Sequence, residues 1–209
     1  MTASSTPPTP PFRAPADAGR ATRRRGAELT RAIYRATLQE LAATSFEELS
    51  FEKIAPKAGT GKSVLYRRWS TTAELVLAAL KDYDVGLGKP LVPDTGTLRG
   101  DLIVLLTAFA RVLDEPRGRA LRPLLTQRPR HPQLFDQVMD QVVLPHRAVL
   151  LDCLRTAVDR GQADPARATP RTAAIGPRLI VAESIERGSV PDSEVHAIVD
   201  EVLLPLLTP

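Results

Sequence analysis

The sequence predicts an all-α fold, because three features of its 209 residues all favour helices. No segment has the alternation of β-branched and polar residues, with a period of two, that marks a strand. Apolar residues recur instead at helical spacing along most of the chain. Prolines fall at or near the start of most expected helices, where the missing N–H costs no hydrogen bond. We expect a three-helix N-terminal domain, residues 23–70, and a larger helical domain, residues 71–209.

Residues 1–22 are expected to be a disordered tail. The segment is rich in Pro, Thr, Ser and Ala, with Phe12 as its one large apolar residue, so burial cannot offset the entropy of ordering it. Arginines gather where the tail meets the first helix, at Arg20, Arg23, Arg24 and Arg25. They are either a solvated charge run or a basic arm that reaches phosphates or a minor groove.

A first helix is predicted over residues 26–44. Its apolar positions lie at helical spacing and are Leu29, Ile33, Tyr34, Leu38 and Leu41. This helix should cover the next two from one side.

The stretch 50–80 predicts two short helices joined by a tight turn, followed by a third helix. Ser50 is a good N-cap for the first of them, and Gly59 suits a turn that needs positive φ. Thr60 or Gly61 can cap the second helix. Thr71 with Glu74 predicts a capping box that opens the third. Two short helices across a glycine turn are typical of a helix-turn-helix, whose second helix enters the DNA major groove.

The second helix of this pair carries cations, hydroxyls and no carboxylate. Lys62 stands at its N-terminus, where a cation costs about 0.3–1 kcal/mol against the helix dipole, so helix stability does not explain it. A solvated basic face is the simpler alternative, but the turn and both flanking caps favour nucleic-acid contact. The residues expected to bear on double-stranded DNA are Ser50, Thr60, Gly61, Lys62, Ser63, Tyr66, Arg67, Arg68 and Thr71.

Residues 25–80 resemble the TetR family of transcriptional regulators. The matching positions are Ser50, Ile54, Ala55, Ala58, Gly59, Leu65, Tyr66, Arg68, Trp69, Thr71, Glu74 and Leu75. Residues 62–69 are most similar to the subgroup whose recognition helix ends in Tyr-Arg-Arg-Trp. The sequence departs from the family pattern at Thr60, Gly61, Val64 and Thr72. Gly61 and Thr72 stand where the family often places a hydroxyl and a cation against phosphates.

Charge and composition agree with DNA binding by the N-terminal part of the chain and a different function for the C-terminal part. Residues 1–80 carry 12 Lys and Arg against 7 Asp and Glu, whereas residues 81–209 carry 16 against 17. No apolar run reaches 18 residues, and the N-terminus lacks the apolar core of a secretory signal, so we expect a cytoplasmic protein with no membrane partner. Cys153 is the single cysteine and is expected to be a buried thiol, with a redox sensor as the lesser alternative.

The second domain is expected to consist of helices near residues 71–83, 98–114, 116–127, 132–160, 170–187 and 191–207. Pro123 and Pro145 fall inside two of these helices and should kink or break them. The last two helices are the candidate dimer interface, since the resemblance implies a two-fold four-helix bundle. Their apolar residues are Ala173, Ala174, Ile175, Gly176, Leu179, Ile180, Ala182, Val195, Ile198, Val199, Val202, Leu203 and Leu206. Ordinary core is the alternative for the final helix.

The resemblance also implies an effector site in the helical body. Aromatic residues are scarce there, so a pocket would be mainly aliphatic and suit an apolar or amphipathic ligand. Its expected lining is Leu105, Phe109, Leu113, Leu125, Phe135, Val138, Met139, Val142 and His146, for each of which plain core is the alternative. No metal, cofactor or catalytic group is expected, because His131, His146 and His196 lie on different helices without metal-ligand spacing.

These observations predict a homodimeric, ligand-responsive repressor that binds a palindromic operator. The alternative is a helical small-molecule-binding protein whose DNA binding has weakened or been lost, as Gly61 and Thr72 suggest. An enzyme is the least supported reading.

Overall fold

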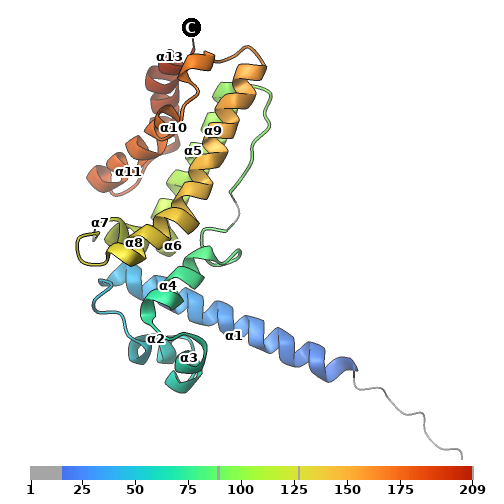
Figure 1. Cartoon of the computed structure of the whole chain (residues 1–209), viewed down its shortest axis with the longest axis vertical. Coiled ribbons are helices and arrows are strands. Elements are labelled where there is room, and N and C mark those ends of the chain that lie inside the picture. Colours follow the sequence, from blue (N-terminus) through green and yellow to red (C-terminus); the bar gives the residue numbers. More distant parts are fainter. Residues whose placement is uncertain (1–15, 89, 127, 209) are drawn as a thin grey trace, which may run out of the picture.

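The computed structural model describes residues 16–88, 90–126 and 128–208, and these residues form helices without any strand. The all-α prediction is therefore confirmed. Figure 1 shows two helical parts stacked along the long axis of the molecule, with α1 extending sideways from the lower part. The lower part consists of α1 (Ala16–Ala43), α2 (Phe51–Lys57), α3 (Lys62–Arg68) and α4 (Thr72–Lys81).

The upper part, which we call the body, contains the remaining elements. Its first half comprises α5 (Leu98–Asp114), α6 (Pro116–Arg119), α7 (Leu121–Thr126), α8 (Pro132–Val138) and the π-helical segment η1 (Met139–Val143). Its second half comprises α9 (Leu144–Asp159), the 3-10 turn η2 (Pro165–Arg167), α10 (Pro170–Ala173), α11 (Ile175–Arg187), α12 (Asp192–Ala197), the π-helical segment η3 (Ile198–Leu203) and α13 (Leu204–Leu207).

The first helix begins earlier than the sequence suggested. Residues 1–15 of the expected tail lie outside the described residues. Residues 16–22, the end of the expected tail, are described as the start of α1, which begins at Ala16. Arg20, Arg23, Arg24 and Arg25, for which a basic arm is one of the two interpretations, are thus residues of this helix.

The turn between α2 and α3 has the geometry that its glycine predicts. Gly59 has a φ of 67°, in the left-handed region that suits glycine. The N–H of Thr60 donates to the carbonyl of Ala55, and the N–H of Gly59 donates to that of Pro56. This pair of bonds is a Schellman motif, which ends α2 sharply and redirects the chain into α3.

Two hydrophobic cores organise the molecule. The lower core buries Ile33, Ile54 and Leu65 completely and continues upward through residues of α7 and α8. The upper core joins α5, α9, α11 and the terminal helices, with Leu106 and Ile180 at its centre. Because the lower core crosses the boundary between the two parts, α8 packs against α4 and shares a core with the DNA-binding helices.

Four prolines explain where the body helices break or widen. Proline clashes with the carbonyl four residues before it, so the preceding turn must end or loosen. One helix ends and another begins around Ala120 and around Ala174. Pro123 and Pro177 therefore each occupy the third position of a new helix. Pro145 and Pro205 instead follow π-helical segments that keep the helix continuous. The break expected at Pro145 is thus replaced by a widened turn.

Most residues proposed for the dimer face are interior to the chain itself. Ala173, Ala174 and Ile180 are buried, as are Val195, Ile198, Val199 and Leu203. Gly176 allows a close approach within the chain, since a Cβ there would lie 3.0 Å from methyl groups of Leu106 and Leu203. Ala182 and Val202 remain exposed. The stripe of small residues on α11 therefore packs against α5 and η3, which corrects that part of the expectation.

Candidate nucleic-acid interface

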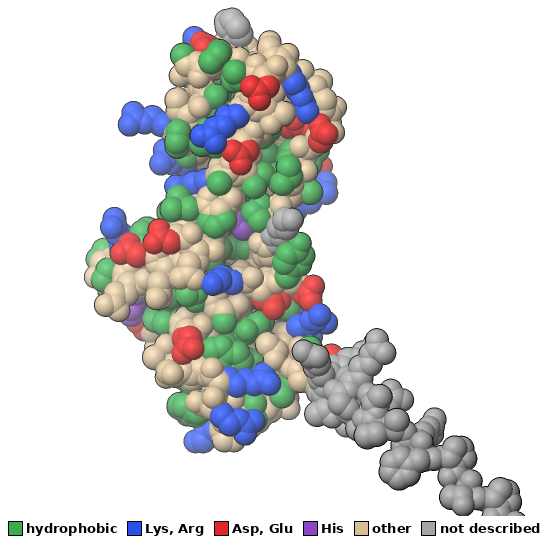
Figure 2. Space-filling model, turned by 45° about the vertical axis from the view of Figure 1, so that its right-hand side comes forward, with side chains coloured by type: hydrophobic (Ala, Val, Ile, Leu, Met, Phe, Trp, Pro, Cys, Tyr) green, Lys and Arg blue, Asp and Glu red, His purple; other side chains and the backbone are tan. Residues whose placement is uncertain are grey.

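Helix α3 stands at the outer end of the lower part and presents its polar side to solvent. Gly61 is its N-cap, with no side chain to supply a capping bond, and Leu65 anchors the helix in the core. The exposed residues are Lys62, Ser63, Tyr66, Arg67 and Arg68. Figure 2 shows Lys and Arg side chains gathered at the lower end of the molecule, where Figure 1 places α2 and α3.

Two cations of α3 have no counterion in the described part of the chain. Lys62 and Arg67 make no ion pair or hydrogen bond there, whereas Lys53 on α2 pairs with Glu48 at 3.7 Å. An unneutralised cation pair on an exposed helix attracts an external polyanion, because phosphate contacts gain free energy by releasing counterions. The arrangement therefore suits the nucleic-acid contact that the sequence predicts for this helix.

Tyr66 is held in a defined orientation at the centre of this surface. Its ring, 56 % exposed, packs edge-on against Phe51 with 4.8 Å between ring centroids. Its hydroxyl donates to Oε1 of Glu52 at 3.2 Å, and this hydrogen bond raises the pKa of Tyr66. Glu52, on α2, thus orients the phenol, a contact that sequence patterns alone did not identify.

Arg68 turns back towards α1 rather than outward with its neighbours. Its Nη1 donates to Oγ1 of Thr30 at 2.6 Å, and its guanidinium lies 5.9 Å from the ring of Trp69. Trp69 is buried and packs against Tyr34 at 5.9 Å between ring centroids. The end of α3 is therefore tied to α1 by residues 38 positions apart in the chain, for which no local sequence signal exists.

The hydroxyls expected to cap the flanking helices do so. Ser50 Oγ accepts from the N–H of Lys53 at 3.3 Å, and Thr71 Oγ1 accepts from that of Glu74 at 3.1 Å. The carboxylate of Glu74 accepts from the N–H of Ser70 at 2.8 Å, one residue earlier than a capping box requires. The predicted capping box is thus shifted by one residue. Both hydroxyls keep a proton that they can donate to a phosphate.

A buried carboxylate anchors α2 to α1. Glu40 is 5 % exposed, and its Oε2 pairs with Nζ of Lys57 on α2. Lys57 is thus tied to α1 through this pair, although 53 % of its own side chain is exposed. This pair joins α2 to α1 just before the turn that leads into α3.

The connection between α4 and α5, residues 82–97, is fastened at its lower end by polar contacts. Leu87 donates its N–H to the carbonyl of Leu80 at 2.9 Å, and Arg117 on α6 donates to the carbonyl of Gly86 at 3.0 Å. His146 lies between the connection and η1, with Nε2 3.4 Å from the carbonyl oxygen of Leu87 and Nδ1 2.7 Å from that of Val142.

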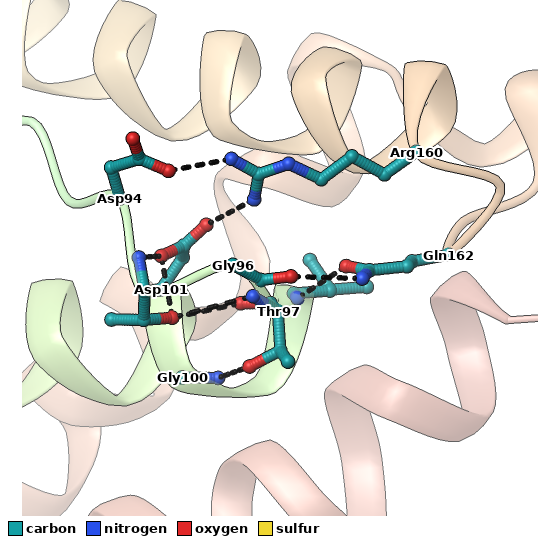
Figure 3. Close-up of polar contacts among 9 residues, drawn as sticks. Asp94, Gly96, Thr97, Gly100, Asp101, Arg160 and Gln162 are labelled. Carbon is teal, nitrogen blue, oxygen red and sulfur yellow. Dashed lines mark hydrogen bonds and ion pairs between the residues drawn. The ribbon is translucent and has the colours of Figure 1, made fainter.

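A denser network fastens the upper end of the same connection (Figure 3). Asp101, only 3 % exposed, accepts hydrogen bonds from the N–H and the hydroxyl of Thr95 at 2.7 and 2.8 Å. Arg160, at the end of α9, donates to Asp101 at 3.3 Å and to Asp94 at 2.6 Å. Gln162 accepts from the N–H of Leu98 at 2.8 Å. The start of α5 is thus locked to the end of α9.

The residues predicted to line an effector pocket are divided between the two cores. Leu105, Phe109 and Leu113 belong to the upper core, whereas Leu125, Val138 and Val142 belong to the lower one. Phe135 packs under the guanidinium of Arg128 at 5.1 Å, and Met139 is half-buried. The structure therefore does not gather the predicted lining into a single core.

Two hollows lie elsewhere in the described residues. One, with room for about 10 Å³, is enclosed by leucines of α5 and α9 and by the start of α11. That volume holds about one water. The other, an open cleft of about 280 Å³, lies where α1 meets the connection and α6, and its lining includes Arg35, Asp84 and Glu115. None of the nine predicted residues lines either hollow.

Two further features bear on the other sequence expectations. Cys153 is buried, and burial raises the pKa of its thiol to about 11. Within the described ranges, no cluster of three His, Cys, Asp or Glu side chains has the geometry to hold a metal ion. No described helix is long and apolar enough to cross a membrane.

Comparison with known proteins identifies both parts of the chain. Residues 33–79 match the family model for bacterial regulatory proteins of the tetR family, and residues 92–202 match the tetracyclin repressor-like C-terminal domain. An HTH-type transcriptional regulator of Mycobacterium tuberculosis is 33% identical over 174 residues, which are 82% of this chain and 84% of that protein. The DNA-binding transcriptional repressor TetR of Mycobacteroides abscessus is 29% identical over 88% of this chain and 97% of its own length.

Solved structures agree with this assignment. A TetR family transcription regulator of known crystal structure is 26% identical and superposes with a TM-score of 0.61, covering 87% of this chain and 100% of its own. The flavonoid-responsive regulator FrrA, 17% identical, shares the fold with a TM-score of 0.63, covering 88% of this chain and 98% of its own. The chain therefore belongs to the TetR family of bacterial transcriptional regulators.

Proposed function

We propose that this regulator is a cytoplasmic repressor that binds a palindromic operator as a homodimer and leaves it when an effector binds the body. The observation that carries the proposal is the exposed face of α3, where Lys62 and Arg67 have no counterion among the described residues. Each subunit of the dimer would place this face in one of two major-groove segments about one DNA turn apart.

Individual roles follow from the geometry of that face. Lys62 and Arg67 supply phosphate contacts, and Ser63 and Tyr66 face the base edges. Ser50 and Thr71 donate their hydroxyls to phosphates, while Thr60 and Gly61 let the backbone approach closely. Arg68 orients the end of α3 through Thr30. Within the family, we assign the chain to the subgroup with Tyr-Arg-Arg-Trp at this place, because residues 66–69 carry that run.

The effector response rests on the fastening of the connection between α4 and α5. An apolar or amphipathic ligand that separated α5 from α9 would strain the network around Asp101 and the contact of His146 with Leu87. Either change would move α4, and with it the spacing of the two recognition helices. Such a ligand must bind the form in which α5 and α9 are separated more tightly than the closed form, since ligands shift an equilibrium only by binding its states unequally.

The second candidate function is that of a small-molecule-binding protein whose helical body still binds a ligand but whose N-terminal domain no longer binds DNA. It is favoured by Gly61, which gives α3 no side-chain cap, and by Thr72, which stands where the family often has a cation.

Titration of the full-length chain onto labelled DNA separates the two proposals. Fragments from around its own gene are compared with shuffled fragments of the same length at 50 and 200 mM salt. The repressor proposal expects a selective complex that weakens steeply as salt rises. Equal affinity for all fragments, or none at either salt concentration, would favour the alternative.

A further inference from the structure

The open cleft at the junction of the two parts has a lining that the proposed function does not use. Its polar residues come from three segments, namely α1 (Arg35, Gln39), the chain just after α4 (Asp84) and the start of α6 (Glu115, Arg117). Helix α6 packs against α1 beside the cleft, where the two parts meet in Figure 1. Its volume of about 280 Å³ equals that of roughly nine waters, which suits a small organic molecule.

Hydrogen bonds hold the walls of this cleft in place. The carboxylate of Asp82 accepts from the N–H groups of Asp84 and Val85 at 3.0 and 2.9 Å, which fixes the turn after α4. Arg117 donates from Nη1 to the carbonyl of Gly86 at 3.0 Å, which holds α6 against that turn. The walls are therefore preorganised, so a ligand would lose little binding free energy to ordering them.

Both carboxylates in the lining already have cationic partners. Oδ2 of Asp84 lies 2.6 Å from Nη2 of Arg31 on α1. Oε2 of Glu115 lies 2.7 Å from Nε of Arg117. A cationic ligand would have to compete with these two arginines, so the charges of the cleft disfavour amines.

Hydrogen-bond donors in the lining, by contrast, remain unused. The side chain of Arg35 is exposed and makes no ion pair or hydrogen bond with the described residues, and the same holds for Gln39 one helical turn later. The Nε–H of Arg117 is buried and lacks a well-aligned acceptor, although Glu115 lies close to it. Guanidinium groups bind carboxylates through strong charge-assisted hydrogen bonds, so these donors suit an anion.

The remaining lining of the cleft is apolar. It consists of Leu38, which is 2 % exposed, and of Val85 and Pro116, which are half-buried. A ligand with an apolar part beside its anionic group would cover this surface and gain free energy by burying it. A bare inorganic anion would leave the apolar surface in water.

We propose that the cleft binds a small amphipathic carboxylate, with its carboxylate group on Arg35 and its apolar part against Val85 and Pro116. This site goes beyond the proposed function, because it is separate from the effector site between α5 and α9. Arg35 belongs to α1 and Pro116 to α6, so the bound carboxylate would join the DNA-binding part of the chain to the body.

Binding of para-fluorobenzoate to the full-length chain tests the site, with the fluorine NMR signal of the ligand as the readout. A ligand of this size should bind with a Kd on the order of 1 mM. The neutral para-fluorobenzamide has nearly the same shape and should bind at least about tenfold more weakly, because it lacks the charge that Arg35 pairs with. Equal affinity for the amide would overturn the proposal.

Replacement of the arginine locates the bound anion. Arg35→Gln should weaken para-fluorobenzoate binding at least about tenfold, and Arg35→Lys should weaken it less, because lysine keeps the charge but not the planar fork. Arg171→Gln is the matched control, because Arg171 is exposed on α10, has a side chain without a partner in the described chain, and does not line the cleft. Equal affinities of Arg35→Gln and Arg171→Gln would contradict the assignment.

A second variant tests the same site while keeping the arginine. Gln39→Glu places a carboxylate four residues after Arg35, where the two side chains can pair along α1. This internal counterion should weaken para-fluorobenzoate binding at least about threefold, whereas Gln39→Ala should change it less. Binding that is unchanged in Gln39→Glu would show that Arg35 does not hold the ligand.

Competition by inorganic phosphate tests the amphipathic character of the ligand. Phosphate at the same concentration should displace little para-fluorobenzoate, because it gains nothing from the apolar lining. Complete displacement would mean that the cleft takes any anion and would overturn the ligand class. These titrations contain no DNA, so their outcome is independent of the repressor proposal.

Discussion

Arg68 and Thr30 are joined by a hydrogen bond of 2.6 Å from the guanidinium Nη1 to the hydroxyl oxygen. The same hydroxyl donates its own proton to the carbonyl of Gly26 at 2.9 Å, so its lone pairs are free to accept from Arg68. This contact sets the end of α3 against α1, which makes Arg68 a positioning residue in our account.

Thr30→Val should therefore weaken operator binding without removing a phosphate contact. We expect a loss of about 0.5–1.5 kcal/mol in the free energy of unfolding, typical of one hydrogen bond. Operator affinity should fall several-fold, with an unchanged slope of log K against log salt. The measurements are urea unfolding and DNA titration at several salt concentrations. A flatter slope would mean that Arg68 itself reaches DNA.

Lys57→Met should destabilise the DNA-binding domain, because it leaves the buried carboxylate of Glu40 without a counterion. About 1–3 kcal/mol of unfolding free energy is expected, less than for a fully buried pair since Lys57 is partly solvated. Adding Glu40→Leu should recover much of the loss. If Lys57→Met is neutral in urea unfolding while DNA affinity falls, then Lys57 contacts DNA and the pair is incidental.

Arg160→Leu should loosen the junction of α5 with α9, since Asp101 is almost fully buried and would lose its cation. The expected cost is about 2–4 kcal/mol of unfolding free energy. Arg155→Leu is the matched control, because its pair with Asp152 is exposed and should contribute less than about 0.5 kcal/mol. Amide hydrogen exchange should rise at residues 95–102 in the first variant alone. Equal losses of unfolding free energy in Arg160→Leu and Arg155→Leu would show that the network around Asp101 does not hold α5 to α9.

Cys153 should resist thiol reagents in the folded protein. Its pKa is raised to about 11 by burial, so the thiol is protonated in the native state at pH 8. A raised folded-state pKa contributes stability that is complete below the unfolded pKa of about 9 and is lost as the pH rises through 11. Labelling kinetics with and without urea measure this directly. Rapid labelling of the folded chain would reopen the redox interpretation.

The sequence was most informative where structure is local. The N-caps Ser50 and Thr71, the turn at Gly59 and the bounds of α5 follow from short-range chemistry, and the structure confirms them. The small residues of α11 were expected at the dimer interface but pack within the chain. Small residues indicate that a helix packs closely, but they do not indicate which helix it packs against. The contacts of Arg68 with Thr30 and of Arg160 with Asp101 join residues far apart in the chain, so no periodicity reveals them. The DNA-contacting residues remain predictions.

The most direct test of the central claim is the salt dependence of operator binding by Lys62→Ala. Lys62 is exposed and makes no ion pair or hydrogen bond with the described residues, so its replacement by Ala should not alter folding. If α3 lies in the major groove with Lys62 on a phosphate, affinity falls and the slope of log K against log salt flattens by about one unit per subunit. An unchanged slope with unchanged affinity would contradict the claim that the cationic face of α3 is the surface that meets DNA.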